Sequence, residues 1–238
     1  MRIAVIGSGI SGNLAARLLA TAHHVDLYES ADRIGGHAHT VQVNAYGLQT
    51  EADVAFMVFN RKTYPVFCRM LQELGIGTQD SDMSLSVRCF KSGLEFQGSS
   101  LNGLFAQRRN LVRPSFHSML IDVARFNREA IAFCEQPVEG MLLGTFLNKL
   151  HLGREFQEHY LIPMSAAIWS ADPASLAGFP AKFILGFYRN HGLLQLRDRP
   201  QWLTVPRRSR NYVQQLISPL GDRVHVNRQV ESVRRIEG

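Results

Sequence analysis

Six residues near the start of the chain, Gly7-Ser8-Gly9-Ile10-Ser11-Gly12, have the spacing of a dinucleotide-binding turn. The string follows a short apolar run, residues 2–6, and opens a helical pattern over residues 10–22. In that setting Gly7 permits a tight turn, Gly9 lets the backbone approach a pyrophosphate, and Gly12 lets the helix lie close to the strand. Free N–H groups and the positive end of the helix dipole would then bind the phosphate anion.

An acidic residue follows at the distance that this chemistry requires. Glu29 lies 17 residues after Gly12, at the end of a second predicted strand over residues 25–28. An acid there accepts hydrogen bonds from the adenosine ribose hydroxyls and repels the 2′-phosphate of NADP. The sequence therefore predicts a cofactor with an unphosphorylated adenosine ribose, which leaves NAD and FAD.

The stretch after Glu29 separates these two cofactors. Gly35-Gly36-His37, with Thr40 three residues later, resembles the E-x(4–6)-G-G-R/H-x-x-T/S signature of two-dinucleotide-binding flavoproteins. These are the flavin-containing amine oxidases, protoporphyrinogen oxidases and phytoene-desaturase-like enzymes, and the histidine is typical of one bacterial branch. The resemblance implies FAD, with Gly35, Gly36 and His37 on the far side of its pyrophosphate. The other cofactor-binding residues that it implies around the two turns are Ser8, Ser11, Ser30 and Thr40.

Further segments strengthen the resemblance. Residues 53–60 are similar to the branch's segment beside the flavin ring, which implies that Ala55, Phe56 and Asn60 lie toward the flavin. Residues 162–170 look like its substrate-domain pattern.

The end of the chain resembles the branch's return into the FAD-binding domain. Residues 202–213 match that return segment, except that Arg207-Arg208 stands where the branch often has Gly before the serine. Val230 matches the position whose backbone meets the adenine.

No catalytic residue is assigned from the sequence. Trp169 and His191 fall in the substrate-domain pattern, but an aromatic residue among small ones in a helical region is more typical of a core. His37 and His39 are spaced like two metal ligands on a strand, yet no further ligand pattern supports them, so no metal is predicted. The sequence contains neither G-x-S-x-G nor H-E-x-x-H, so hydrolase and zinc-protease functions have no support.

The elements that must position these residues follow a βαβ order, then a hairpin and helices, then a helix at 209–219 with strands at 223–226 and 230–236. This order predicts an α/β fold in which a Rossmann-type FAD-binding domain, a parallel sheet with flanking helices, is interrupted by an α+β substrate domain. The expected domains are 1–78 with 205–238 for FAD, and 79–204 for the substrate.

Charge is uneven along the 238 residues, whose formal net charge is +6. Residues 1–188 carry 16 basic and 16 acidic side chains, whereas residues 189–238 carry 10 arginines and four acids. These arginines are spread over several elements without a nucleic-acid-binding motif, so no nucleic-acid partner is predicted. A peripheral contact with an anionic membrane stays open, because related enzymes handle lipid-like substrates.

Three cysteines without C-x-x-C spacing are typical of reduced thiols, and no secretory signal or membrane-spanning run is evident, so the predicted location is the cytoplasm. The oligomeric state is left open.

The resemblance implies an FAD-dependent oxidoreductase that removes two electrons from a C–N or C–C bond of an amine or a lipid-like small molecule, with hydride transfer to the flavin. The family continues beyond these residues, so we expect a member truncated at its C-terminus, with a naturally minimal form as the alternative. Two other functions stay open: a non-catalytic or incomplete dinucleotide-binding fragment and, less favoured, an NAD-dependent dehydrogenase.

Overall fold

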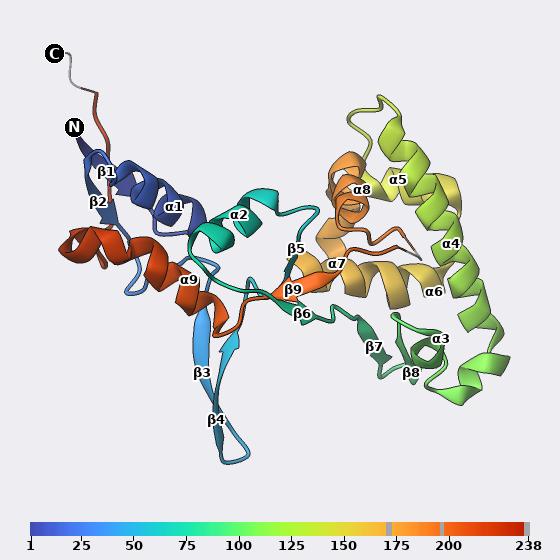
Figure 1. Cartoon of the computed structure of the whole chain (residues 1–238). Helices are drawn as coiled ribbons and strands as arrows, with labels where there is room; N and C mark the ends of the chain where they lie inside the picture. The colour runs from blue at the N-terminus through green and yellow to red at the C-terminus, as the bar shows by residue number, and fades with distance from the viewer. Residues whose placement is uncertain (170–172, 196–197, 236–238) are drawn as a thin grey trace. The chain divides into compact units, whose positions relative to one another are not determined.

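The computed structural model describes residues 1–169, 173–195 and 198–235. The chain forms two compact units (Figure 1): unit 1 comprises Met1–Asp82 and Gln201–Gly238, and unit 2 comprises Met83–Pro200. That unit 1 is the FAD-binding domain and unit 2 the substrate domain stays a prediction.

A parallel sheet in unit 1 carries the predicted glycine turn. Strands β1 (Arg2–Ile6) and β2 (His24–Tyr28) pair in parallel, and β10 (Val224–His225) adds to the other edge of β2. Helix α1 (Ile10–Leu19) follows β1 directly and packs on the sheet through the fully buried Ala16. The predicted α/β fold class with a parallel sheet is therefore confirmed.

The rest of unit 1 consists of a hairpin, a second small sheet and two helices. Residues 40–53 form an antiparallel hairpin, and three short strands pair in the order β5-β9-β6. These elements are β3 (Thr40–Ala45), β4 (Leu48–Asp53), β5 (Phe59–Asn60), α2 (Pro65–Glu73), β6 (Gln79–Ser81), β9 (Trp202–Thr204), α9 (Arg208–Ile217) and the 3₁₀ helix η4 (Ser218–Arg223). Figure 1 shows α9 running beside α1, with which it is in contact.

Unit 2 is built around a long helix and a small hairpin. Helix α4 (Pro114–Glu135) begins with a proline, whose missing N–H is not needed at the first helical position. The hairpin of β7 (Ser86–Cys89) and β8 (Leu94–Gln97) contributes apolar side chains to the same core. The remaining elements are α3 (Leu101–Leu104), η1 (Arg108–Val112), α5 (Leu143–Leu150), α6 (Arg154–Phe156), the π-helical turn η2 (Gln157–Leu161), α7 (Ile162–Trp169), η3 (Pro173–Gly178) and α8 (Ala181–Asn190).

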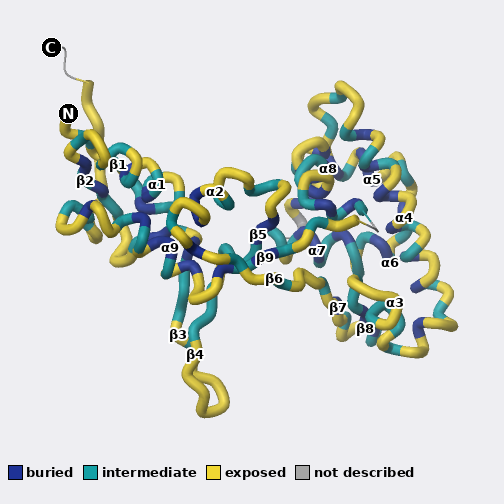
Figure 2. The backbone as a smooth tube through the Cα atoms, in the orientation of Figure 1, coloured by how far each residue is buried: buried dark blue, intermediate teal, exposed yellow. Residues whose placement is uncertain are grey.

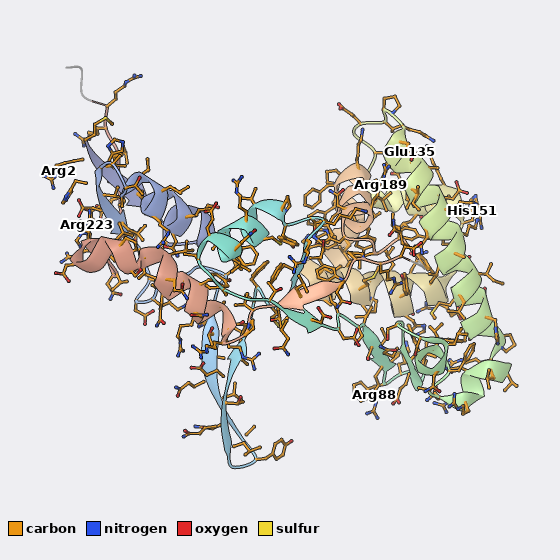
Figure 3. The ribbon with its side chains drawn as sticks, in the orientation of Figure 1. Arg2, Arg88, Glu135, His151, Arg189 and Arg223 are labelled. Atoms are coloured by element: carbon orange, nitrogen blue, oxygen red, sulfur yellow. The ribbon has the colours of Figure 1, made fainter. Side chains whose placement is uncertain are left out.

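The two units differ in how their cores are assembled. Figure 2 marks buried segments along α4, where Phe126 is fully buried within a single large apolar cluster. In the described part of unit 1 there are two smaller clusters, one around α2 and α9 and one between α1 and the parallel sheet. On the surface of unit 2, Arg189 on α8 forms an ion pair with Glu135 on α4 at 3.4 Å (Figure 3).

One predicted strand is not observed. Residues 230–235 have no regular secondary structure, and residue 236, like residue 170 of the substrate-domain pattern, lies outside the described part of the chain. A strand needs a neighbour for its backbone hydrogen bonds, and within the described residues β10 pairs only with β2. Among the described residues, no helix has the length and apolar character needed to cross a bilayer.

Candidate functional site

The turn between β1 and α1 has the geometry predicted from its glycines. Gly7 has a left-handed backbone (φ 92°), and its N–H donates to the Tyr28 carbonyl at 2.8 Å. A Cβ at Gly12 would lie 1.9 Å from the Gly7 carbonyl oxygen, so this position tolerates only glycine without backbone movement. Gly9, the N-cap residue of α1, has open space where its Cβ would be. The turn thus leaves the helix N-terminus open at Gly9.

A second glycine turn lies directly against the first. Gly35 and Gly36 both have left-handed backbones, with φ of 113° and 59°. A Cβ on Gly36 would lie 3.1 Å from the Gly9 Cα atom, and a Cβ on Gly35 would lie 2.5 Å from the Ala38 carbonyl oxygen. Two turns that are distant in sequence therefore form one backbone surface.

Ser8 and Glu29 connect these turns to the end of β2. The Ser8 N–H and Oγ–H donate to Glu29 Oε2 at 2.8 and 2.6 Å, and the Gly35 N–H donates to the Ser8 carbonyl at 2.9 Å. Glu29 Oε1 accepts from the Ala31 N–H and the Ser30 hydroxyl. Hydrogen bonds from Ala31 and Ser8 lower the pKa of Glu29 to about 2, because they favour the charged form. Glu29 is therefore ionised at neutral pH.

A pocket of about 470 Å³ opens beside the two turns. Six of the sequence-predicted residues line it: Gly9, Ser11, Gly35, Gly36, His37 and Phe56. Its other walls are Ile10, Leu14, Ala38, Tyr64, Val66, Phe67, Met70 and Tyr212. Residues 63–74 have the pattern of an amphipathic helix with Val66 and Met70 on one face, but the sequence does not indicate the aromatic wall. Except for His37, the lining has no ionisable side chain other than tyrosine, which suits a largely apolar planar group.

Phe56 reaches this pocket because its segment continues the hairpin ladder. The Phe56 N–H donates to the His37 carbonyl at 3.1 Å, and the Val54 N–H donates to the His39 carbonyl at 3.0 Å. The Phe56 ring packs edge-on against Tyr64 and Phe67. The neighbouring Ala55 is exposed and lies outside the pocket lining.

Three other predicted residues lie away from this pocket. Asn60 is fully buried, and its Oδ1 accepts from the backbone N–H groups of Lys62 and Thr63, so it shapes the turn that precedes α2. Val230 lies in the stretch without regular structure and is 36% exposed. Thr40 lines a second pocket, of about 380 Å³, together with His39. Their predicted contacts with a cofactor stay predictions.

A hydrogen-bond network that the sequence did not reveal fixes the start of α9. Asp53 accepts from the Ser209 N–H at 3.1 Å, from the Ser209 hydroxyl at 2.7 Å and from the Thr40 hydroxyl at 2.7 Å. The chain enters α9 through Arg207 and Arg208, which both have left-handed backbones. This conformation is unfavourable for residues with a side chain, and the Asp53 cap offsets part of the cost.

The two histidines considered as metal ligands line different pockets, His37 the first and His39 the second. Among the described residues, no group of three or more His, Cys, Asp or Glu side chains is placed to hold a metal ion.

The candidate site thus consists of a glycine turn, an acid and a second glycine turn that contacts the first. The model of the flavin containing amine oxidoreductase family matches residues 10–238. The chain belongs to this family. Members of the family bind FAD, so the predicted cofactor is confirmed at the level of the family. No curated protein matches the sequence.

Solved structures of other oxidoreductases share the fold. The cyclohexylamine oxidase from Brevibacterium oxydans IH-35A superposes with a TM-score of 0.67 at 18% identity, covering 95% of this chain and 51% of that chain. A putrescine oxidase bound to putrescine gives a TM-score of 0.64 at 18% identity with the same coverage. An oxidoreductase from Methanosarcina mazei gives 0.55 at 15% identity, covering 95% and 51%. The chain thus spans about half the length of these structures.

Proposed function

We propose that the chain binds FAD in unit 1 and acts in the two-electron oxidation of a small-molecule amine. The observation that supports this most directly is the contact between the two glycine turns, where a Cβ on Gly36 would lie 3.1 Å from Gly9 Cα. Bare backbone on both sides of one opening suits a pyrophosphate, and the pocket beside it suits an isoalloxazine ring.

The residues present fit FAD by their chemistry. The first-turn N–H groups of α1 have no partner within the helix, so they can donate to an anion. The absence of a side chain at Gly9 leaves open space at the pocket wall, and ionised Glu29 can accept ribose hydroxyls. Phe56, Tyr64 and Phe67 would exclude water from the flavin side.

When bound, FAD would supply the redox chemistry as the acceptor of two electrons from the C–H bond beside the substrate nitrogen. The protein then has to orient the substrate and keep the site dry, which needs no strong base. We assign no catalytic residue. It stays a prediction that the chain oxidises a C–C bond or a lipid-like substrate and that the basic stretch 189–238 makes a peripheral membrane contact. The cytoplasmic location and the absence of a nucleic-acid partner also stay predictions.

The experiment is to add FAD to the purified chain, remove free FAD by gel filtration and record the visible spectrum. We expect a bound flavin spectrum that bleaches when putrescine or cyclohexylamine is added without oxygen. Gly9→Ala is the matched control, because its Cβ meets no protein atom but would occupy the space beside the pocket. A wild-type protein that stays colourless contradicts the proposal.

A second candidate is FAD binding without turnover. The chain spans about half the length of the amine oxidases that it resembles, and the described pocket has no carboxylate or lysine. The same experiment separates the two: a flavin spectrum that no amine bleaches favours binding alone. Retention of NAD in place of FAD would favour a dehydrogenase.

A further inference from the structure

The two carboxylate oxygens of Glu29 lie in different surroundings. Oε2 accepts both the N–H and the hydroxyl of Ser8, whose relative exposure is 0%. Oε1 accepts the Ala31 N–H at 2.9 Å and the Ser30 hydroxyl at 3.2 Å, and both of these bonds are exposed. One oxygen thus faces the interior of the turn and the other faces solvent.

Each carboxylate oxygen has room for about two hydrogen bonds, so the four donors fill Glu29. A ligand hydroxyl can bind only by replacing one of them. The Ser8 N–H belongs to the backbone of the first turn. The Ala31 N–H belongs to the segment after β2, where the Ala31 carbonyl accepts from the Asn227 N–H at 2.9 Å. Neither N–H group can leave without moving the backbone. The choice therefore lies between the hydroxyls of Ser8 and Ser30.

Of these two hydroxyls, that of Ser8 is fixed by further hydrogen bonds. Its hydroxyl oxygen also accepts from the Gly35 N–H at 3.2 Å, and its carbonyl accepts from the same N–H at 2.9 Å. Loss of its bond to Glu29 would leave a buried hydroxyl without its acceptor, which is costly. The Ser30 hydroxyl makes the longer bond, is exposed and can turn to water without cost.

We propose that Glu29 divides its carboxylate: Oε2 holds the glycine turns through Ser8, and Oε1 binds a ribose hydroxyl that displaces the hydroxyl of Ser30. This inference rests on the proposed binding of FAD. It makes Ser8 a positioning residue rather than a ligand contact, and it makes Ser30 a competitor of the ligand. The low pKa of Glu29 agrees with a carboxylate that carries its full charge in both roles.

The test compares Ser8→Ala with Ser30→Ala in the full chain. Binding of FAD and of ADP is measured by isothermal titration calorimetry, with 2′-deoxy-ADP as the probe that lacks one ribose hydroxyl. We expect Ser8→Ala to weaken ADP binding about tenfold, as for loss of a charge-assisted hydrogen bond. Ser30→Ala should bind ADP as tightly as wild type or a few times more tightly. Discrimination against 2′-deoxy-ADP should persist in Ser30→Ala and decrease in Ser8→Ala.

A second readout reports on Glu29 itself. The pKa of its carboxyl, followed by carbon NMR, should rise in Ser8→Ala, which a merely structural role of Ser8 away from Glu29 would not cause. In the Glu29→Gln background, Ser8→Ala should have little further effect on ADP binding, because the two side chains act as one unit.

The outcomes distinguish this inference from the proposed function. A wild-type chain that binds neither FAD nor ADP overturns both. If wild type binds, weaker ADP binding by Ser30→Ala overturns the inference alone, and this exposed variant is expected to fold even if Ser8→Ala does not. Equal affinity of folded Ser8→Ala and wild type also overturns it.

Discussion

Unit 1 and unit 2 should be destabilised by opposite kinds of substitution. In unit 1 the site depends on backbones that touch where glycines leave out a side chain, as at Gly12 and Gly36. Among the described residues, the core of unit 2 is a single cluster of 21 buried apolar residues, whereas unit 1 has clusters of 10 and four. Adding a methyl group should therefore harm unit 1 most, and removing apolar volume should harm unit 2 most.

The chain offers a separate optical probe for each unit. Its two tryptophans, Trp169 and Trp202, lie in unit 2 and unit 1 respectively. In a Trp202→Phe background the remaining fluorescence reports unit 2, and in a Trp169→Phe background it reports unit 1. Urea unfolding of these two parent proteins provides the baseline for the predictions on stability.

The largest expected effect is in the core of unit 2. Phe126 is fully buried and contacts the rings of Phe146 and Phe156. Phe126→Ala should lower the free energy of unfolding of unit 2, followed through Trp169, by about 3–5 kcal/mol. FAD binding should change little. If the binding free energy of FAD fell by as much as the stability of unit 2, the expected independence of the site in unit 1 from the core of unit 2 would be contradicted.

The next effect is the addition of one methyl group in unit 1. Gly12→Ala places a Cβ 1.9 Å from the Gly7 carbonyl oxygen, so strand and helix must separate. We expect unit 1, followed through Trp202, to lose about 3 kcal/mol, together with FAD binding. Gly9→Ala should keep the stability of unit 1 and lose only FAD binding. If Gly9→Ala and Gly12→Ala lower the free energy of unfolding of unit 1 equally, the close contact at Gly12 is not what destabilises the Gly12→Ala variant.

Two buried asparagines allow a matched comparison of the units. Asn13 on α1 and Asn127 on α4 are buried, and neither amide has a hydrogen-bond partner for its oxygen or nitrogen among the described residues. Replacing each with leucine removes unsatisfied polar atoms and improves helix propensity, so each variant should gain about 1–2 kcal/mol. Thermal unfolding of each variant in its matching tryptophan background measures this gain. A loss of stability in either variant would contradict this expectation.

The smallest effect is the acid sensitivity of unit 1. Glu29 has a pKa of about 2 in the folded chain, below its ordinary value of 4.5. The lowered pKa stabilises the folded state above about pH 4.5, and this stabilisation is lost as the pH falls through 2. Glu29→Gln should remove the fall in the stability of unit 1, followed through Trp202, between about pH 4.5 and 2. The stability of unit 2, followed through Trp169, should not change. An identical acid transition in wild type and variant would contradict this.

Local signals explain what the sequence could predict. The strand before Gly7, the helix after Gly9 and the strand before Glu29 were recognised because glycine positions and apolar runs act over a few residues. For the same reason the sequence predicts hairpin strands at residues 85–90 and 94–96 and a helix at residues 115–135, and the bounds of β7, β8 and α4 lie within one residue of these. The family resemblance implied only that the second glycine turn lies on the far side of the pyrophosphate, and the direct contact of Gly36 with Gly9 was not predicted.

The features that the sequence could not predict depend on contacts between residues that are far apart in the chain. Asp53 caps α9 across 156 residues, and no local pattern announces that pairing. Tyr212 falls within the helix predicted at residues 209–219, and no local pattern indicates that it forms a wall of the pocket together with Phe67. The predicted strand at 230–236 had suitable residues, but strand formation depends on a neighbouring strand that local sequence does not specify.

The contact between Gly9 and Gly36 has a consequence for the order of folding. These residues are 27 positions apart, so a short peptide with the first glycine turn and its helix would contain only half of the binding surface. In the proposed function, a nucleotide would bind tightly only after both segments have docked, and its binding free energy would add to the stability of unit 1. At a ligand concentration one hundred times Kd this gain is about 2.7 kcal/mol. Refolding yields of unit 1 should therefore depend on FAD, whereas those of unit 2 should not.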